Sequence, residues 1–313
     1  MALKLRRAHM VRLSLASAAV AALAFIPVVT ASASGTSAPS ATQSDAGSGD
    51  RQAEANKALV IYFNDQLFND GNLSVIDRYV APTYLQHNPT LPSGPAALRQ
   101  LVTTVRTLFP HLKTATVRAV AEGDLVVLEN RVVSVPGGPA NANFDIYRVE
   151  GGKLVEHWDV LQSEPSTTVS GNDMLSQLST PAGDTARAST TARDKGLVLD
   201  YLTGLTQDHN LGVINRYVSP SVYQHDPTLA NGSAALEQAY SKLIAQYPTY
   251  GVSVAQVAAE GDLVAVHAHV RNAPSDLGQA VVYLFRVRNG KIVEQWDSVQ
   301  NVPATSANNN TMF

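Results

Sequence analysis

The amino-acid sequence repeats itself after 138 residues. Residues 76–98 align without a gap with residues 214–236, and 14 of these 23 positions are identical. The same shift places residues 153–159 on residues 291–297, where Lys, Val, Glu, Trp and Asp recur. A period of this length corresponds to a whole domain and not to a solenoid repeat. The sequence therefore predicts two tandem copies of one domain.

The first 33 residues have the three-part layout of a secretory signal peptide. Basic residues come first, an apolar run follows from residue 13 to residue 29, and Ala31-Ser32-Ala33 forms a small-x-small cleavage site. We expect cleavage after Ala33 and release of a secreted, extracellular protein. No stable membrane span is expected after cleavage, because the apolar run is short and contains Pro27. A retained membrane anchor is the alternative, and the export route stays open.

The stretch after the predicted signal is rich in Ser, Ala, Gly and Thr. Such a segment buries too little apolar surface to offset the entropy lost on ordering, so a disordered leader is expected. A similar composition predicts a linker between the repeats. The expected organisation is a signal peptide at 1–33, a leader at 34–52, a first domain at 53–175, a linker at 176–191 and a second domain at 192–313.

Composition excludes several classes of function. The absence of cysteine excludes disulfides, cysteine nucleophiles and thiolate metal sites. The 45% hydrophobic content is sufficient for apolar cores. The net charge of −3 provides no basic surface for nucleic acid or anionic lipid, so the expected partner is a small-molecule substrate or ligand. The sequence also lacks a Gly-x-Ser-x-Gly nucleophile motif, a glycine-rich phosphate loop and a His-Glu-x-x-His zinc motif.

Within one repeat, helical periodicity changes to strand periodicity along the chain. In the first repeat, apolar spacing predicts helices at residues 54–68, 73–80 and 93–108. Extended structure is expected at residues 83–87, and strands are expected at residues 114–121, 125–133, 143–149 and 153–162. Helices followed by an antiparallel meander define an α+β domain.

Two motifs in the first repeat resemble the SnoaL-like polyketide cyclases, a family of the nuclear transport factor 2-like (NTF2-like) superfamily. They are Tyr-x-Gln-His-x-Pro at residues 84–89 and Asp-x-Tyr-Arg-Val-x-x-Gly-Lys-x-Val-Glu-His-Trp-Asp at residues 145–159. The resemblance implies two tandem cone-shaped domains, each with N-terminal helices packed on a curved antiparallel sheet around a pocket. It also implies cofactor-independent aldol chemistry, in which an aspartate of the last strand acts as general acid and base. The matching residues are Asp159 and Asp297.

The last predicted strand of the first repeat carries the candidate catalytic group. Side chains alternate along a strand, so His157 and Asp159 point to one face while Glu156 and Trp158 point to the other. A carboxylate in an apolar cavity has a raised pKa and can accept a proton from a carbon next to a carbonyl. The alternative is that Asp159 caps backbone groups near the strand end.

Histidines at equivalent places in the two Gln-His-x-Pro motifs are further candidates. His87 and His225 could each donate a hydrogen bond to a developing enolate oxygen, or could anchor the strand before the proline. The predicted catalytic residues are therefore Asp159, His87, Asp297 and His225. The expected substrate-binding residues are aromatic or ionisable side chains in and near the motifs: Tyr84, Asp145, His157, Trp158, Tyr223 and Trp296. A place in the core is the alternative for the two tryptophans.

The two repeats differ at positions expected to line the pocket. Tyr283 stands where the first repeat has Asp145, and Gln295 stands where it has His157. The second repeat has therefore lost two ionisable groups. We expect the first repeat to be the catalyst and the second to have changed specificity or to support the first.

Two further constellations point to other chemistry. Arg131 with Asp145 and Asp159 could imitate the Asp-Arg-Asp set of an epoxide hydrolase, in the first repeat only. His267 and His269 share one strand face, as two ligands of a metal ion would. The first repeat has Arg131 in place of His269, and no third ligand is evident. Neither a metal nor a cofactor is therefore expected.

These observations favour a secreted enzyme that acts by acid–base chemistry on a small carbonyl compound, as an aldol cyclase or an isomerase. The alternative is a noncatalytic extracellular protein that binds small molecules in the same pockets. A third possibility is that outer sheet faces pair, within the chain or in a homodimer. The substitution Asp159→Asn separates the first two, because an enzyme loses turnover and keeps its ligand affinity.

Overall fold

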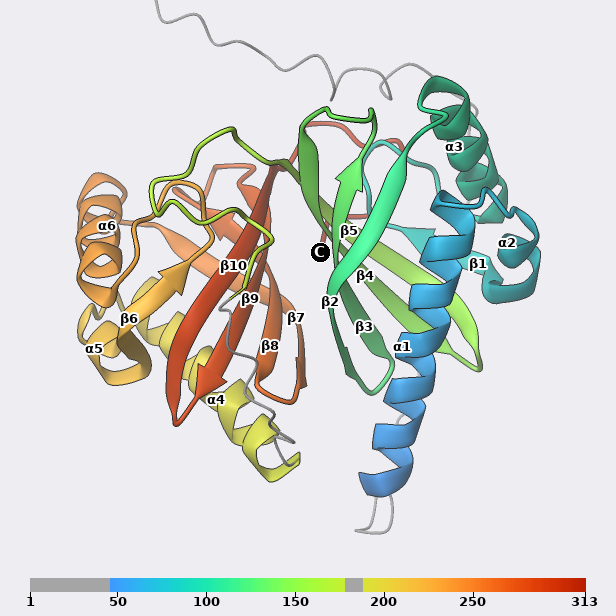
Figure 1. The fold of residues 1–313 in the computed structure, drawn as a ribbon. Coiled ribbons are helices and arrows are strands. Elements are labelled where there is room, and N and C mark those ends of the chain that lie inside the picture. The colour runs from blue at the N-terminus through green and yellow to red at the C-terminus, as the bar shows by residue number, and fades with distance from the viewer. Residues whose placement is uncertain (1–45, 178–187) are drawn as a thin grey trace, which may run out of the picture. The chain divides into compact units, whose positions relative to one another are not determined.

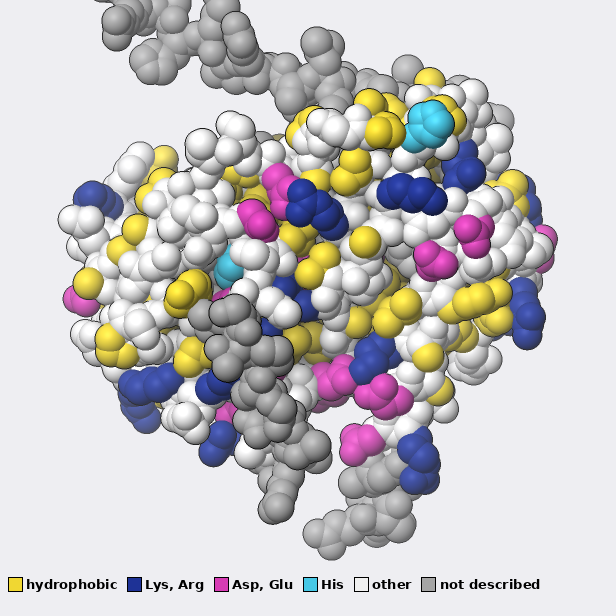
Figure 2. Space-filling model, in the orientation of Figure 1, with side chains coloured by type: hydrophobic (Ala, Val, Ile, Leu, Met, Phe, Trp, Pro, Cys, Tyr) yellow, Lys and Arg dark blue, Asp and Glu magenta, His cyan; other side chains and the backbone are white. Residues whose placement is uncertain are grey.

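The computed structural model describes residues 46–177 and 188–313 (Figure 1). The predicted signal peptide, most of the predicted leader and the central part of the predicted linker lie outside these ranges. Within the two ranges, no helix has both the length and the apolar run that crossing a membrane requires. On the face shown in Figure 2, acidic and basic side chains are interspersed, in keeping with the net charge of −3.

Residues 46–163 form three helices and one five-stranded sheet. The helices are α1 (Ala46–Phe68), α2 (Ser74–Tyr79) and α3 (Pro95–Leu108). The strands are β1 (Val80–Gln86), β2 (Lys113–Glu122), β3 (Leu125–Val133), β4 (Ala140–Glu150) and β5 (Lys153–Ser163). Their order in the sheet is β1-β5-β4-β3-β2, with β1 parallel to β5 and the other neighbours antiparallel.

Residues 188–301 have the same arrangement. The helices are α4 (Ala188–Thr206), α5 (Gly212–Tyr217) and α6 (Ser233–Gln246). The strands are β6 (Val218–Gln224), β7 (Gly251–Glu260), β8 (Leu263–Arg271), β9 (Gln279–Arg288) and β10 (Lys291–Asn301), in the order β6-β10-β9-β8-β7. Two tandem α+β domains are thus confirmed. The expected antiparallel meander is present as β2–β5 and β7–β10, and β1 and β6 join these sheets as parallel edge strands.

The first helix of each repeat begins earlier than the sequence predicts. Helix α1 starts at Ala46, so residues 46–52 are helical and do not belong to a disordered leader. Helix α4 starts at Ala188, inside the predicted linker. Extending an existing helix costs far less free energy than nucleating one. Polar residues can therefore add turns to the N-terminal end of a packed helix.

Helix α1 covers one face of the first sheet, which is called the inner face below. Val60, Phe63 and Leu67 are buried at helical spacing and form a core with Leu128 and Tyr147 of the sheet. The second repeat has an equivalent core between its own helices and sheet. The opposite side of each sheet is called the outer face.

The hairpins before the last strands have matching backbone shapes. Gly151 and Gly152 have φ values of 54° and 74°, which glycine adopts at low cost. The second repeat has Asn289 and Gly290 there, with φ values of 51° and 71°. Asparagine tolerates this conformation better than most other residues. Equivalent residues of β5 and β10 therefore lie on equivalent sheet faces.

The outer faces of the two sheets pack against each other. One apolar cluster contains Val127, Ile146 and Trp158 of the first repeat together with Leu284 and Trp296 of the second. Apolar side chains of these strands are thus buried on both faces of the sheets. The helices of the same repeat cover the inner face, and the sheet of the other repeat covers the outer face.

Two equivalent glutamates also join the repeats. Glu122 accepts a hydrogen bond from the backbone N–H of Ala259 at 2.9 Å, and Glu260 accepts one from that of Ala121 at 2.8 Å. Lysines of α4 and α1 pair with these glutamates. The recurring Glu-Gly-Asp sequence therefore forms a turn and also a contact between the repeats.

The segments after the last strands are exchanged between the repeats (Figure 1). The post-β5 segment (residues 164–177) contacts the second repeat, and the post-β10 segment (residues 302–313) contacts the first. The backbone N–H of Val169 donates to a proline carbonyl of the second repeat at 2.9 Å. That of Ala307 donates to the equivalent proline of the first repeat at 2.7 Å. Each repeat is therefore completed by a segment from the other.

Candidate functional site

Three ionisable side chains meet on the inner face of the first sheet. Asp145 lies on β4, and His157 and Asp159 lie on β5. Asp145 is the cross-strand partner of Asp159, and Nε2 of His157 lies 3.1 Å from Oδ1 of Asp145. One donor atom from each of the three lies within 4.8 Å of the others. Strand alternation thus places His157 and Asp159 together, as the sequence pattern predicts.

Asp159 combines burial with an unpaired carboxylate oxygen. Only 7% of the residue is exposed. Its Oδ2 accepts a 2.8 Å hydrogen bond from the Asn88 amide, whereas its Oδ1 has no hydrogen-bond partner among the described residues. Burial raises the pKa of Asp159 to about 6; His157 and the Asn88 hydrogen bond oppose this rise, and the charge of Asp145 adds to it. Such a carboxyl group changes protonation state close to neutral pH.

His157 has a hydrogen-bond acceptor at both ring nitrogens. Nδ1 lies 3.0 Å from Oε1 of Gln86, and Nε2 faces Asp145. The same Gln86 oxygen accepts the backbone N–H of Asn88 at 2.9 Å, which determines the orientation of the amide. Both ring nitrogens therefore face oxygen atoms, and the ring lies next to the carboxylates. Tyr147 packs on it, with ring centroids 4.5 Å apart.

Asp145, His157 and Asp159 are also a donor set that could hold a metal ion. Each carboxylate of the set also has an amide donor. Asn130 donates to Asp145 at 2.8 Å, as Asn88 donates to Asp159. Each of these hydrogen bonds holds one carboxylate oxygen in place. A buried carboxyl group held in this way suits acid–base chemistry.

Tyr84 is a neutral hydroxyl donor near these carboxylates. It is 3% exposed. Burial, followed by the negative charges of Asp159 and Asp145, holds the pKa of Tyr84 well above its usual range. The phenol therefore keeps its proton. The second repeat has Val222 at this position and lacks the hydroxyl.

His87 does not face Asp159. Its ring lies on the outer face, stacked on Trp158 with centroids 4.6 Å apart. Nε2 faces Oε1 of Glu156 at 2.9 Å, and Nδ1 faces the Thr311 carbonyl of the post-β10 segment at 2.5 Å. Both nitrogens are engaged on the side of the sheet away from the carboxylate. The expected role as a donor to an enolate is therefore corrected, and the anchoring alternative fits.

The second repeat has the same arrangement on its outer face. His225 stacks on Trp296 with centroids 4.9 Å apart, and its Nε2 lies 3.1 Å from Oε1 of Glu294. Its Nδ1 faces the Asp173 carbonyl of the post-β5 segment at 2.7 Å. Both histidines of the Gln-His-x-Pro motifs thus hold an exchanged segment.

Three of the expected substrate-binding residues lie away from the inner faces. Trp158 and Trp296 fill the apolar contact between the repeats, which is a core position. Tyr223 is 40% exposed, because Val222 takes the inward position that Tyr84 has in the first repeat. Moving an aromatic by one residue along a strand transfers it to the opposite face. These three residues therefore do not share the carboxylate site.

The inner face of the second repeat carries a pair of carboxyl groups. Asp226, at the position of Asn88, is hydrogen-bonded to Asp297, which is 5% exposed. Burial, the charge of Asp226 and this hydrogen bond raise the pKa of Asp297 well above its usual range. Two carboxyls at hydrogen-bond distance share a proton. The protonated form of Asp297 is therefore favoured more than in an ordinary aspartate.

Tyrosines accompany this pair. Tyr283 lies opposite Asp297 in the register of β9 and β10, and Tyr250 is hydrogen-bonded to Tyr240 and Tyr283. Burial raises the pKa of Tyr250 to about 12, so it stays a neutral O–H donor. The second repeat thus places tyrosine hydroxyl groups near Asp297, and one of these tyrosines, Tyr283, stands where the first repeat has Asp145.

Sequence reasoning missed four residues of the inner faces: Asn88, Asp226, Tyr240 and Tyr250. The first two occupy the variable place of Gln-His-x-Pro, and the change from Asn to Asp there was a usable signal. The two tyrosines replace Val and Leu of the first repeat, and single tyrosines at core positions are ordinary.

Two other sequence hypotheses do not fit the geometry. Arg131 is half exposed and pairs with Glu164 at 3.1 Å, so it does not join the two aspartates in an epoxide hydrolase set. His267 and His269 both stack on Phe313, with centroids 5.5 Å and 4.2 Å away. Burial lowers the pKa of His267 to about 3, which keeps its ring neutral. Packing against Phe313 therefore explains why two histidines lie on the same face of this strand.

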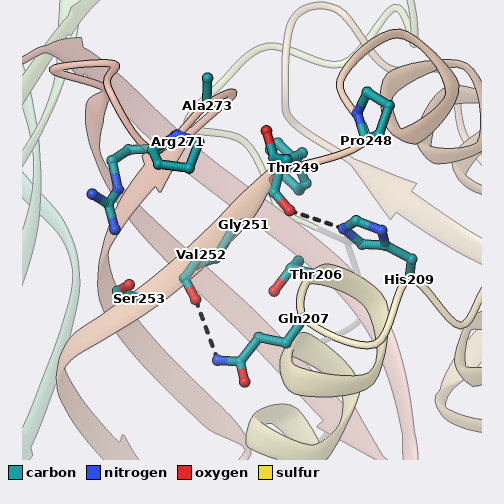
Figure 3. A pocket seen from close by; sticks show the side chains of 12 residues that line it. Thr206, Gln207, His209, Pro248, Thr249, Gly251, Val252, Ser253, Arg271 and Ala273 are labelled. Carbon is teal, nitrogen blue, oxygen red and sulfur yellow. Dashed lines mark hydrogen bonds between the residues drawn. The ribbon is translucent and has the colours of Figure 1, made fainter.

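The second repeat also contains a cavity of about 390 Å³ between the end of α4 and the start of β7 (Figure 3). Figure 3 shows His209 and Gln207 reaching backbone carbonyls there, at 2.9 Å and 3.5 Å. None of the predicted site residues lines this cavity. Tyr250 belongs to both the cavity wall and the tyrosine cluster, so the cavity adjoins the second repeat's donors and not the Asp159 site.

Comparison with known families identifies both repeats. The SnoaL-like polyketide cyclase family matches residues 58–165, and the SnoaL-like domain family matches residues 198–295. No curated protein matches the chain.

Several solved structures are similar to part of the chain. TsrD from Streptomyces laurentii is 12% identical over 35% of this chain and 89% of its own, with a TM-score of 0.31. A SnoaL-like protein of unknown function from Burkholderia thailandensis is 12% identical over 35% of this chain and 96% of its own, with a TM-score of 0.31. A loop-truncation variant of IdmH is 21% identical over 33% of this chain and 91% of its own, with a TM-score of 0.29.

Proposed function

The chain belongs to the SnoaL-like polyketide cyclase family, as two tandem copies, and we propose that its first repeat is an acid–base catalyst acting on a small carbonyl compound. The observation that carries the proposal is the state of Asp159, a buried carboxyl group with a pKa of about 6 and one oxygen without a partner among the described residues. Such a group can take a proton from a carbon next to a carbonyl and return it elsewhere. The reaction is then an intramolecular aldol cyclisation or an isomerisation.

The neighbouring groups meet the other needs of this reaction. Removal of the proton leaves negative charge on the carbonyl oxygen, and the neutral Tyr84 hydroxyl is a donor for it. His157 lowers the pKa of Asp159 against the effect of burial, which keeps the base form accessible near neutral pH. Asn88 holds one carboxylate oxygen and leaves the other for the substrate. Asp145 holds the imidazole of His157 at Nε2, the ring nitrogen that does not face Gln86.

The second repeat is proposed to bind rather than to abstract protons. Burial and the neighbouring Asp226 raise the pKa of Asp297 well above its usual range, which disfavours its base form. The tyrosine hydroxyls next to it suit a ligand that accepts hydrogen bonds. This division extends the expectation that the first repeat is the catalyst.

A noncatalytic extracellular binding protein is the alternative function. The predicted signal peptide supports it, because polyketide cyclisation takes place in the cell, where the activated precursor is made. In that case Asp159 holds a ligand and does not react with it.

The test is hydrogen exchange at the α-carbon of a β-keto ester in D2O, followed by NMR. The wild-type chain is compared with Asp159→Asn, and Asp297→Asn is the matched control in the second repeat. We expect Asp159→Asn to lower the exchange rate above buffer by at least about 100-fold and the control to leave it unchanged. Loss of exchange in Asp297→Asn alone would reject the first repeat as the catalyst. Probe binding without exchange in the wild type would establish the binding alternative.

A further inference from the structure

The loop that carries Asn88 is held by the second repeat. Asn308 of the post-β10 segment donates from its amide to the Asn88 carbonyl at 2.8 Å and to the Leu91 carbonyl at 2.7 Å. Ala307 donates its backbone N–H to the Pro89 carbonyl at 2.7 Å. Three backbone carbonyls of one short loop are thus bound from the other repeat.

A second asparagine holds the end of β1, just before this loop. Asn310 donates from its amide to the Gln86 carbonyl at 2.9 Å. The side chain of Gln86 faces His157 at 3.0 Å, and the side chain of Asn88 holds Asp159 at 2.8 Å. The post-β10 segment therefore binds the main chain of both residues that position the charged groups of the site.

The post-β10 segment is itself anchored. Met312 is buried in the apolar contact between the repeats. Phe313 stacks on His269 with centroids 4.2 Å apart, and the Thr311 carbonyl receives His87. A segment fixed at three points presents its asparagine amides in one orientation.

We propose that Asn308 and Asn310 are positioning residues for the first repeat, so that the second repeat completes the Asp159 site by clamping the loop that carries Asn88. The inference rests on the proposed function of Asp159. Neither asparagine contacts the carboxylate, and both act through the main chain of the loop. The two repeats are then one functional unit and not two independent sites.

The exchanged arrangement provides a matched control. Asn172 of the post-β5 segment donates from its amide to the Gln224 carbonyl at 2.9 Å, as Asn310 does to Gln86. Asn172→Ala therefore removes the same kind of hydrogen bond from the second repeat. The loop of the first repeat stays untouched in this variant.

The test measures Asp159 itself and does not depend on a substrate. The carboxyl carbon of Asp159 is titrated by ¹³C NMR in the wild type and in the double variant Asn308→Ala/Asn310→Ala, with Asn88→Ala and Asn172→Ala as controls. The Asn88 hydrogen bond lowers the pKa of Asp159, so a loosened loop raises it. We expect the titration midpoint of Asp159 in the double variant to move toward the midpoint measured in Asn88→Ala. In Asn172→Ala, we expect the midpoint of Asp159 to equal that of the wild type.

The outcomes separate the clamp from the proposed function. The proposed clamp is wrong if the midpoint of Asp159 is shifted in Asn88→Ala but has the wild-type value in the double variant. With the β-keto ester, we expect the double variant to lose roughly tenfold in kcat with KM nearly unchanged, because displacement of a catalytic group slows chemistry more than binding. A shifted midpoint in the double variant, together with no exchange in the wild-type chain, would support the clamp and reject the catalytic proposal. If the double variant does not fold, each single variant, which retains half of the clamp, is titrated in its place.

Discussion

The amide of Asn88 donates a 2.8 Å hydrogen bond to Asp159. In the second repeat the same place is taken by Asp226, which shares a hydrogen bond with Asp297. An amide can only donate to a carboxylate through its N–H, whereas a second carboxyl must first hold a proton. One difference in the Gln-His-x-Pro motif thus gives the last-strand aspartate an amide donor in the first repeat and a second carboxyl group in the second repeat, where it helps to raise the pKa of Asp297.

The rate of proton abstraction is expected to follow the ionisation of Asp159. The base form is required, so kcat/KM for exchange of a β-keto ester should rise with pH through about 6 and level off above it. The measurement is a pH–rate profile from pH 4.5 to 8.5. Asp297→Asn should keep the same profile. A rate that falls as the pH rises through 6 would show that the protonated form is needed.

Asp159 is expected to lower the stability of the chain at neutral pH. Its folded-state pKa, about 6, lies above the ordinary value of 3.8, so between these values the folded chain holds a proton that the unfolded chain has lost. The free energy of unfolding therefore falls as the pH rises from about 4 to about 6. Asp159→Asn removes this dependence. Its stability relative to the wild type should rise by about 3 kcal/mol between pH 4 and pH 8, measured by urea unfolding.

A matched control for that measurement is Asp77→Asn. The side chain of Asp77 is 73% exposed and pairs with Arg99 at the surface, so its substitution should change the free energy of unfolding by less than about 1 kcal/mol. A pH-independent stability difference for Asp159→Asn would contradict the raised pKa.

Exchanging Asn88 and Asp226 is expected to exchange the behaviour of the two sites. Asn88→Asp places a second carboxyl beside Asp159, which raises its pKa and should destabilise the chain by about 1–3 kcal/mol at pH 8. Asp226→Asn gives Asp297 an amide donor and should stabilise the chain at the same pH. Urea unfolding at pH 5 and pH 8 checks both. If Asn88→Asp and Asp226→Asn change the free energy of unfolding in the same direction at pH 8, this position does not set the difference between the two sites.

The buried ion pair between Arg118 and Glu129 is expected to be sensitive to loss of one partner. It lies at the contact between the repeats, with the guanidinium 4.1 Å from the ring centroid of Trp296. Glu129→Gln leaves the cation buried and unpaired and should cost about 3–5 kcal/mol in unfolding free energy. The second repeat has a neutral pair there, Gln256 and His267, joined at 2.6 Å.

That neutral pair suggests the control. The double variant Arg118→Gln/Glu129→His copies it into the first repeat and should recover most of the stability lost in Glu129→Gln. Equal destabilisation of the single and double variants would show that the charges themselves are not responsible. Thermal or urea unfolding with the fluorescence of Trp158 and Trp296 as the probe makes the comparison.

The mature protein is expected to begin at Ser34 and to be recovered outside the cell. The basic, apolar and small-residue regions of residues 1–33 predict this processing. Intact-mass measurement on protein from a secreting host checks it, and Ala33→Arg should block cleavage. Recovery of the full-length chain from membranes would instead support a retained anchor.

Local periodicity predicted much of the fold. Apolar spacing indicated a helix over residues 54–68, which lies within α1, and the alternation along β5 placed His157 and Asp159 on one side of the sheet. These predictions hold because helix and strand periods act over a few residues.

The position of His87 shows where such reasoning ends. His87 follows β1 directly, and the face it takes depends on the parallel pairing of β1 with β5, in which the register shifts between Val80 and Leu85. No local pattern reports that shift. The recurrence of Trp158 and Trp296 likewise indicated burial but not that the two would meet in one cluster.

The sequence by itself determined that there are two copies of one domain, the order of their elements and which residues of a strand share a face, because repeats and periodicities are properties of neighbouring residues. Only the tertiary structure decided that His87 turns away from Asp159 and that Asn308 holds the loop of Asn88. The contacts that settle these points join residues 224 and 220 positions apart. Such contacts arise from the packing of whole domains, which no short stretch of sequence encodes.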